Sequence, residues 1–173
     1  YIIVATMKTT KVLETNITET NINEVSKILN FSSNNRVAIC NANTLVRSVK
    51  DINIRNTINK FTIKTPDGFP VAKALTLLTK KKFSRVDGYK VFLQTISDGL
   101  DTNRRHFFFG NNENTTKKMI EKLKEMFPNI KVSGYICPEH MAAEELALKY
   151  KENFQSINAD IVWVSLGFPK QEQ

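Results

Sequence analysis

The chain has 173 residues, of which 41% are hydrophobic, and it carries a formal net charge of +8. This length suffices for one well-buried domain and excludes two large ones, and no apolar run is long enough to cross a membrane. The excess of Lys and Arg predicts an anionic partner, for which nucleic acid, a phosphorylated small molecule and anionic lipid all qualify. The start of the chain lacks a charged leader followed by an apolar segment, so we expect an intracellular protein.

The cysteines and histidines do not form a metal-binding pattern. Cys40 and Cys137 are far apart in the sequence and match no metal-ligand spacing, as is typical of a protein from a reducing compartment. His106 lies inside an apolar segment, and neither it nor His140 has a partner at ligand spacing. A structural role is favoured for both histidines, and we expect no metal and no cofactor.

Short apolar segments alternate with helical patterns along the chain. We expect an edge strand over residues 10–17, a helix over 21–29, strands near 36–40, 61–64, 105–109, 130–133 and 159–166, and helices over 41–50, 71–80, 91–99, 119–127 and 142–154. Because the strands are continuous apolar runs, this order predicts a single α/β domain over residues 1–173, with a parallel sheet covered by helices on both faces.

Four glycines, Gly68, Gly110, Gly134 and Gly167, fall at the ends of predicted strands. The carboxyl ends of parallel strands share one edge of a sheet, where backbone amides and helix N-termini can hold phosphate. We therefore expect the ligand at this edge.

Asp67 is the candidate catalytic residue of this edge. It follows a predicted strand and lies in Thr65-Pro66-Asp67-Gly68-Phe69-Pro70, where Pro66 restricts the backbone and Gly68 allows positive φ and the close approach of another molecule. A carboxylate at this position lies where open α/β sheets bind their ligands. Pro-Asp-Gly is also ordinary turn chemistry, and taken alone the motif favours a turn.

The basic residues are spread along the chain, with their densest cluster at Lys80-Lys81-Lys82. A solvated helix end is favoured over a binding site for this cluster. An RNA-binding domain is an alternative that rests on the net charge alone. The aromatic residues 107–109 lie in a predicted buried strand, which argues against a stacking platform, so we expect no nucleic-acid partner.

Five segments form an ordered set: Asn41-Ala42-Asn43, Pro66-Asp67-Gly68, Arg85-Val86-Asp87-Gly88-Tyr89, Phe107-Phe108-Phe109-Gly110 and Gly167-Phe168-Pro169-Lys170-Gln171-Glu172. In this order and at this spacing they resemble the WecG/TagA/CpsF glycosyltransferases, also called glycosyltransferase family 26. The resemblance runs from about Val37 to the last residue, and its most specific piece is the Gly-x-Pro-Lys-Gln-Glu ending.

The resemblance implies an enzyme that transfers an N-acetylmannosamine-type sugar from a UDP donor to a polyprenyl-diphosphate-linked acceptor. Such transfer builds teichoic acid linkage units, enterobacterial common antigen or capsule. The family is described as inverting and metal-independent, with a Rossmann-like sheet, and this chain agrees in lacking an Asp-x-Asp motif. The resemblance further implies a cytoplasmic protein that is peripheral at the inner face of the cell membrane, and it suggests self-association into a homo-oligomer.

Three residues match family positions with a chemical role. Asp67 matches the proposed catalytic base, which takes the proton from the acceptor hydroxyl as that oxygen attacks the anomeric carbon. Asn41 would hydrogen-bond the acetamido or hydroxyl groups of the donor, with a helix N-cap as an equal alternative. Arg85 would pair with a donor phosphate, with a surface position as the alternative.

The remaining expected substrate-binding residues are Gly68, Gly88, Gly110, Gly167, Lys170 and Gln171. Gln171 is expected at a helix N-terminus, where it would contact the nucleotide or the sugar. A structural pair between Lys170 and Glu172 is the alternative role for those two side chains.

Two departures from the family pattern affect these expectations. Ile39 stands where some members have a threonine, so that polar contact is absent or replaced. The chain also ends just after Glu172, whereas family members continue into a basic carboxyl-terminal appendage that is proposed to dock on the membrane and to neutralise the leaving diphosphate. We therefore expect weak or no activity from this chain. The alternative function is a non-catalytic nucleotide-sugar-binding module or an inactive fragment that keeps only the fold.

Overall fold

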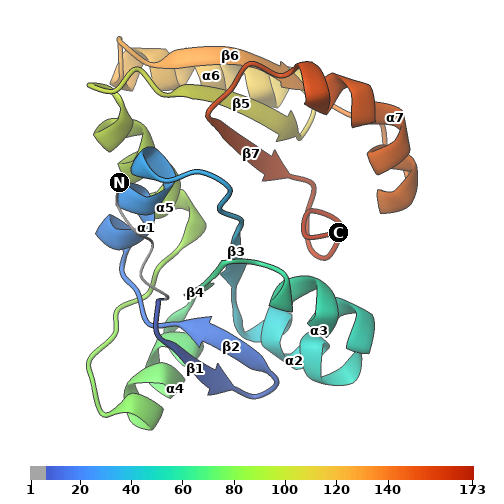
Figure 1. The fold of residues 1–173 in the computed structure, drawn as a ribbon. Helices are drawn as coiled ribbons and strands as arrows, with labels where there is room; N and C mark the ends of the chain where they lie inside the picture. The colour runs from blue at the N-terminus through green and yellow to red at the C-terminus, as the bar shows by residue number, and fades with distance from the viewer. Residues whose placement is uncertain (1–6) are drawn as a thin grey trace. The chain divides into compact units, whose positions relative to one another are not determined.

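The computed structural model describes residues 7–173, and the chain divides into two compact units, residues 1–98 and 99–173 (Figure 1). The elements of the first unit are β1 (Thr9–Val12), β2 (Thr15–Thr18), α1 (Ile22–Phe31), β3 (Val37–Cys40), α2 (Ala42–Lys50), α3 (Ile52–Asn59), β4 (Ile63–Pro66), α4 (Phe69–Thr79) and α5 (Gly88–Gly99). The elements of the second unit are β5 (Arg105–Gly110), α6 (Glu113–Met126), β6 (Lys131–Ile136), α7 (Ala143–Ser156) and β7 (Ile161–Ser165).

The strands of the first unit form an antiparallel hairpin, β1–β2, and a parallel pair, β3–β4. The expected single edge strand over residues 10–17 is therefore wrong. Leu13 has a φ of 54°, which turns the chain back on itself between the two short strands. The hairpin is tied to the parallel pair because the Lys64 backbone N–H donates to Thr18 Oγ1 over 3.0 Å.

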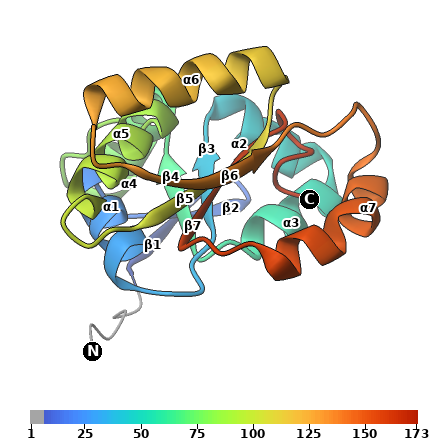
Figure 2. The same cartoon turned by 90° about the horizontal axis from the view of Figure 1, so that it is seen from above.

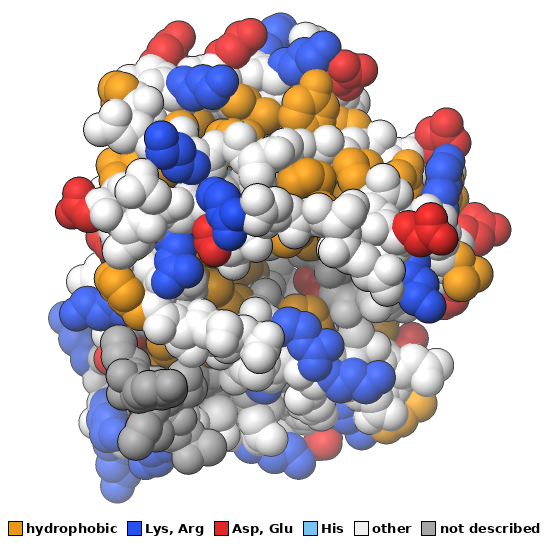
Figure 3. All heavy atoms as spheres, turned by 45° about the horizontal axis from the view of Figure 1, so that its top comes forward, with side chains coloured by type: hydrophobic (Ala, Val, Ile, Leu, Met, Phe, Trp, Pro, Cys, Tyr) orange, Lys and Arg blue, Asp and Glu red, His pale blue; other side chains and the backbone are white. Residues whose placement is uncertain are grey.

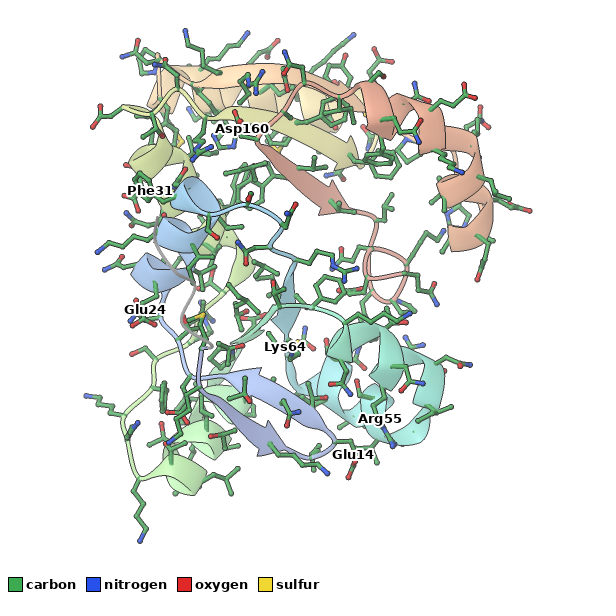
Figure 4. The ribbon with its side chains drawn as sticks, in the orientation of Figure 1. Glu14, Glu24, Phe31, Arg55, Lys64 and Asp160 are labelled. Carbon is green, nitrogen blue, oxygen red and sulfur yellow. The ribbon has the colours of Figure 1, made fainter. Side chains whose placement is uncertain are left out.

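The sequence pattern did not predict α3. This helix begins at Ile52, after the N-cap Asp51, whose Oδ1 accepts from the backbone N–H of Asn53 at 2.8 Å. Its buried residues, Ile54 and Ile58, are one turn apart, and a stripe of that length does not stand out in a sequence. Arg55 fixes the helix by donating to two carbonyl groups at the end of α2, and it lies 3.9 Å from Glu14 of the hairpin turn (Figure 4).

The core of the first unit joins α1, β4 and α5. Val25, Ile63, Val86 and Val91 form its buried cluster and are at most 2% exposed. Val86 immediately follows Arg85 of the second predicted turn, so the hydrophobic core itself holds that turn in place.

The second unit is a parallel sheet with the strand order β6-β5-β7. Figure 2 shows α6 and α7 on opposite faces of this sheet. Phe107 and Phe109 of β5 pack with Leu146 of α7, and the ring of Tyr150 meets that of Phe109 edge to face at 5.5 Å. The predicted Rossmann-like α/β class, with parallel strands and covering helices, is confirmed, while the single domain over residues 1–173 stays a prediction.

Gly134 lies inside β6, so the prediction that it ends a strand is wrong. Its φ is 152°, and the pairing with β5 shifts register beside it, between His106 and Phe107. A Cβ at Gly134 would lie 3.1 Å from Cε2 of Phe107. The glycine therefore makes room for a core phenylalanine of the neighbouring strand.

His106 has the structural role that the sequence favoured. Its side chain is 1% exposed, and its Nδ1 accepts a hydrogen bond from Nε1 of Trp163 on β7 at 3.1 Å. Burial lowers the pKa of His106 from about 6.5 to about 4.

This histidine should make the protein sensitive to mild acid. Below about pH 6.5 the unfolded chain binds a proton at His106, which the folded chain does not bind until about pH 4. The free energy of unfolding therefore falls as the pH is lowered across this window, and the full shift corresponds to about 3 kcal/mol. His106→Gln removes this dependence, because glutamine does not titrate and still offers an oxygen to Trp163. Urea unfolding at several pH values measures the difference, and equal pH dependence in both proteins would contradict the assignment.

Candidate functional site

Asp67 lies directly after β4, at the carboxyl end of the parallel pair. Its backbone N–H donates to the carbonyl oxygen of Cys40 on β3 at 3.0 Å, which holds the turn across both strands. Gly68 follows with a φ of 79° and forms the N-cap of α4. Glycine adopts this conformation at little cost, so the strand-to-helix turn predicted around Asp67 is confirmed.

A second aspartate turn lies against the first. The backbone N–H of Val86 donates to the carbonyl of Pro66 at 3.0 Å. Asp87 then starts α5, because its Oδ1 accepts from the backbone N–H of Lys90 at 3.0 Å, and its Oδ2 pairs with Nη2 of Arg85 at 3.1 Å. The arginine side chain is 54% exposed, and its outer side therefore remains available to a ligand.

The two carboxyl groups have opposite pKa shifts. Burial raises the pKa of Asp67, the negative charge of Asp87 adds to the rise, and the Gly68 backbone N–H and the Arg85 charge oppose it. Burial also acts to raise the pKa of Asp87, but its hydrogen bonds to Lys90 and Arg85 outweigh burial and hold that pKa below the usual value. Neighbouring acids whose environments separate their pKa values are typical of sites that transfer protons.

Asp87 is the residue of this site that the sequence reasoning missed. Its signal was present, because Asp67-Gly68 and Asp87-Gly88 are two Asp-Gly steps that each precede a helix. Residue spacing alone does not reveal that a backbone hydrogen bond places the two steps side by side.

Asn41 has the alternative role that the sequence left open. It is the N-cap of α2, and its Oδ1 accepts from the backbone N–H of Thr44 at 3.1 Å. Within residues 7–173 its Nδ2 has no acceptor, so one donor remains for a ligand. Ile39 packs against Gly88 at the start of α5, where an added Cβ would lie 3.5 Å from Cγ1 of Ile39. The first unit thus brings Asn41, Asp67, Gly68, Arg85 and Gly88 to the carboxyl ends of β3 and β4.

The second unit holds the other predicted residues at the carboxyl ends of β5 and β7. Gly110 ends β5 opposite Ser165 of β7, and a Cβ at Gly110 would lie 2.1 Å from the Ser165 carbonyl oxygen. Close strand approach therefore requires this glycine. Gly167 follows β7 with a φ of 78°, and an added Cβ there would meet nothing within 4 Å. Substrate contact by either glycine stays a prediction.

Residues 168–172 form consecutive turns, and the expectation that Gln171 lies at a helix N-terminus stays a prediction. Two backbone hydrogen bonds stabilise these turns. The N–H of Gln171 donates to the carbonyl oxygen of Gly167, and that of Glu172 donates to the carbonyl oxygen of Pro169, both at 3.1 Å. Lys170 is half-buried beside them. The structural pair considered for Lys170 and Glu172 is not formed in the described chain, where Nε2 of Gln171 donates to Glu172 Oε1 at 2.9 Å.

Glu172 has an unusual environment for a carboxyl group. Burial raises its pKa, and the hydrogen bond from Gln171 only partly opposes that rise. Its Oε2 is buried without a hydrogen-bond partner among residues 7–173. A buried polar atom without a partner is costly, so this oxygen marks a position where a ligand hydroxyl or amide would be stabilising.

Across residues 7–173, no three His, Cys, Asp or Glu side chains lie together in a way that would hold a metal ion. None of the helices in this part of the chain combines the length and the hydrophobicity needed to span a membrane. Lys and Arg side chains are scattered among acidic and apolar ones on the face shown in Figure 3.

Comparison with known proteins adds two relatives. Both are named N-acetylglucosaminyldiphosphoundecaprenol N-acetyl-beta-D-mannosaminyltransferase. The protein of Bacillus subtilis (strain 168) is 26% identical over 141 residues, which are 79% of this chain and 52% of that protein. The protein of Bacillus spizizenii (strain ATCC 23059 / NRRL B-14472 / W23) is 31% identical over 107 residues, which are 62% of this chain and 40% of that protein. The chain thus spans about half the length of the curated relatives it matches.

The sequence profile described as Glycosyl transferase WecG/TagA/CpsF family matches residues 10–173. This range contains both aspartate turns, the glycines at the strand ends and the final Gly-x-Pro-Lys-Gln-Glu segment. Because the match covers nearly the whole sequence, the chain belongs to the WecG/TagA/CpsF family of glycosyl transferases.

Proposed function

We propose that this chain transfers an N-acetylmannosaminyl group from a UDP donor to a polyprenyl-diphosphate-linked N-acetylglucosamine acceptor in the synthesis of a cell-surface polymer. The observation that carries the proposal is Asp67, a half-buried carboxyl group with a raised pKa at the carboxyl end of a parallel strand. The names of the two relatives support the choice of sugar and acceptor. The chain would work as a peripheral protein at the inner face of the membrane, and a carboxyl-terminal segment beyond residue 173 would add further contacts.

In the proposed reaction, the Asp67 carboxylate accepts the proton of the acceptor hydroxyl. The oxygen then attacks the anomeric carbon of the donor sugar, and the bond from that carbon to the UDP oxygen breaks. UDP leaves with the bonding electron pair, and the configuration at the anomeric carbon inverts. A base with a raised pKa holds the abstracted proton more firmly, which favours transfer as long as the group is ionised at the working pH.

The donor would be bound by groups that do not take part in proton transfer. Arg85 faces solvent over half its side-chain surface and would pair with a phosphate of the donor, and the free Nδ2 of Asn41 would donate to a sugar oxygen. Gly68 and Gly88 carry no side chain, which leaves room for the donor beside Arg85 and Asn41. In the second unit, Gly110, Gly167, Lys170 and Gln171 are proposed substrate contacts because they lie at the carboxyl ends of β5 and β7. The proposed reaction needs no metal ion.

The pair of aspartates gives a test that depends on electrostatics. Asp87→Asn keeps a good helix N-cap but removes the negative charge that helps to raise the pKa of Asp67. It also releases Arg85, whose positive charge lowers the same pKa. Since Asp67 must be ionised to act, we expect the acid limb of the kcat/KM profile to move to lower pH in the variant. If the acid limb of the kcat/KM profile stays at the same pH while the variant still transfers sugar, Asp67 is not the titrating group.

A non-catalytic nucleotide-sugar-binding module is the second candidate. One observation favours it: burial raises the pKa of Asp67, and a carboxyl group that is protonated can hydrogen-bond a ligand but cannot act as a base. Calorimetric titration with UDP-N-acetylmannosamine and a transfer assay on the same preparation separate the two functions. Saturable binding that weakens in Arg85→Ala, with transfer of the sugar, supports the enzyme. The same binding without transfer supports the module.

A further inference from the structure

The outer side of α4 combines exposed apolar and basic residues. Phe69, Leu77 and Leu78 are 73%, 69% and 59% exposed. Phe69, Lys73 and Leu77 follow one another at intervals of four residues, so they share one face of the helix. Nζ of Lys73 lies 5.6 Å from the centre of the Phe69 ring, which confirms that the two side chains are neighbours. We call Phe69, Lys73 and Leu77, with the lysines that follow, the α4 face, and Leu78 lies at its border, about 100° around the helix from Leu77.

The lysines of the α4 face are mostly free of acidic partners. Lys80, Lys81 and Lys82 come directly after the helix and are exposed. Lys81 pairs with Glu19 at 3.2 Å. Among the residues that the structure describes, Lys73, Lys80 and Lys82 form no ion pair, so three positive charges remain for a partner.

We propose that the α4 face docks on an anionic phospholipid surface. Apolar side chains flanked by lysines on one side of a helix are typical of segments that lie in the membrane interface. Each lysine there is attracted by the negative potential of acidic lipids, while leucine and phenylalanine leave water for the acyl boundary. This chemistry differs from that of a phosphate pocket, which does not need exposed leucines.

Charge also disfavours a second copy of the chain as the partner. In a symmetric pair the same patch meets itself, which would place the lysines of one α4 face against those of the other. Such an arrangement would bring like charges together around the buried leucines, whereas acidic lipids would neutralise them. The balance of charge therefore favours lipid over a dimer.

This docking rests on the proposed function and adds an orientation to it. Phe69 is two residues after Asp67, so their Cα atoms are at most about 7 Å apart. Insertion of the Phe69 ring at the lipid boundary would hold the catalytic turn at the level of the head groups. The diphosphate of a lipid-linked acceptor lies at that level, and the chain of the lipid would stay in the bilayer during transfer.

Vesicle sedimentation tests the proposal with the 173-residue chain. We expect binding to vesicles of phosphatidylglycerol and phosphatidylcholine, weaker binding in high salt, and little binding to phosphatidylcholine alone. Replacing Lys73, Lys80 and Lys82 together by Gln should lower the partition coefficient on the order of 100-fold. Phe69→Ser and Leu77→Ser should each lower it about tenfold.

Matched controls lie on the second unit. Leu148 of α7 is 78% exposed, so Leu148→Ser changes an equally accessible leucine, and replacing Lys118 and Lys124 of α6 by Gln removes exposed charges. We expect the control variants to bind vesicles as the unchanged chain does. Equal losses in the control and α4 variants, or no preference for phosphatidylglycerol, would overturn the proposal. Dimerisation that Leu77→Ser abolishes, without vesicle binding, would assign the face to a second copy instead.

Tryptophan fluorescence measures directly how deeply the α4 face lies in the bilayer. Brominated lipids should quench the fluorescence of the tryptophan in Leu77→Trp but not that in Leu148→Trp. The fluorescence of the native Trp163 is measured in the unchanged chain as the reference. Transfer to a short-chain, water-soluble acceptor separates this docking from the chemistry. If the α4 variants lose vesicle binding but keep that transfer, both proposals stand. If the unchanged chain binds vesicles and transfers nothing, also when it is joined to the part of the Bacillus subtilis relative that it does not cover, the proposed function fails while the docking stands.

Discussion

Asp67→Asn should abolish most sugar transfer while leaving donor binding intact. Asparagine is nearly the same size and fits the same turn, but it cannot accept the proton of the acceptor hydroxyl. The loss of a general base typically costs about 10²–10⁴-fold, so we expect kcat to fall within that range. Transfer of labelled N-acetylmannosamine and calorimetric binding of UDP, measured on the same preparation, provide the two quantities.

The matched control for this variant is Asp101→Asn, an exposed aspartate in the segment before β5. It removes the same charge from the protein without touching the aspartate turns, so its kcat should be that of the unchanged chain. Normal turnover in Asp67→Asn, with unchanged donor affinity, would remove Asp67 from the role of base.

Gly110→Ala should cause the largest loss of stability of any single methyl group added to the second unit. The new Cβ would lie 2.1 Å from the Ser165 carbonyl oxygen and 2.5 Å from its carbonyl carbon, both of them backbone atoms of the paired strand. A φ of 128° adds strain for any residue other than glycine. Because β5 and β7 must separate to admit the methyl group, we expect a loss of about 3–5 kcal/mol in the free energy of unfolding.

Gly167→Ala distinguishes the cost of the steric clash with Ser165 from the cost of a positive φ. Gly167 also has a positive φ, 78°, but an added Cβ there would meet nothing within 4 Å. We therefore expect a cost of only about 1–2 kcal/mol. Urea unfolding followed by the fluorescence of Trp163 on β7 compares the two variants, and a Gly110→Ala chain that does not fold at all would agree with the larger loss. Equal losses of stability in Gly110→Ala and Gly167→Ala would show that β7 can move away from the new methyl group at Ser165 at little cost.

Much of the fold was predictable because its signals are local. The short apolar segments became β3, β4, β5, β6 and β7, and the helical stripe around Ile120 and Leu123 became the buried side of α6. Asn41 was recognised as a possible helix cap from its residue type and position, and it is one. These features depend on side-chain periodicity and capping chemistry within one element.

The features that were missed depend on contacts between elements or on single backbone angles. Gly134 resembled a strand end, but its place is decided by the Phe107 ring on the next strand. Residues 10–17 resembled a single edge strand, but the φ of 54° at Leu13 turns the chain back into a hairpin. The influence of Asp87 on Asp67 requires the hydrogen bond between Val86 and Pro66, which joins residues 20 positions apart and cannot be read from either motif alone.

The most direct test of the proposed function is a transfer reaction with the 173-residue chain. Labelled UDP-N-acetylmannosamine and a short-chain prenyl-diphosphate N-acetylglucosamine acceptor are incubated with the chain in the presence of EDTA, and the labelled disaccharide lipid is counted. We predict a product that requires both substrates and that is lost in Asp67→Asn. A folded chain that binds the donor and forms no product, also when it is joined to the part of the Bacillus subtilis relative that it does not cover, would contradict the assignment of a transferase and leave the binding module.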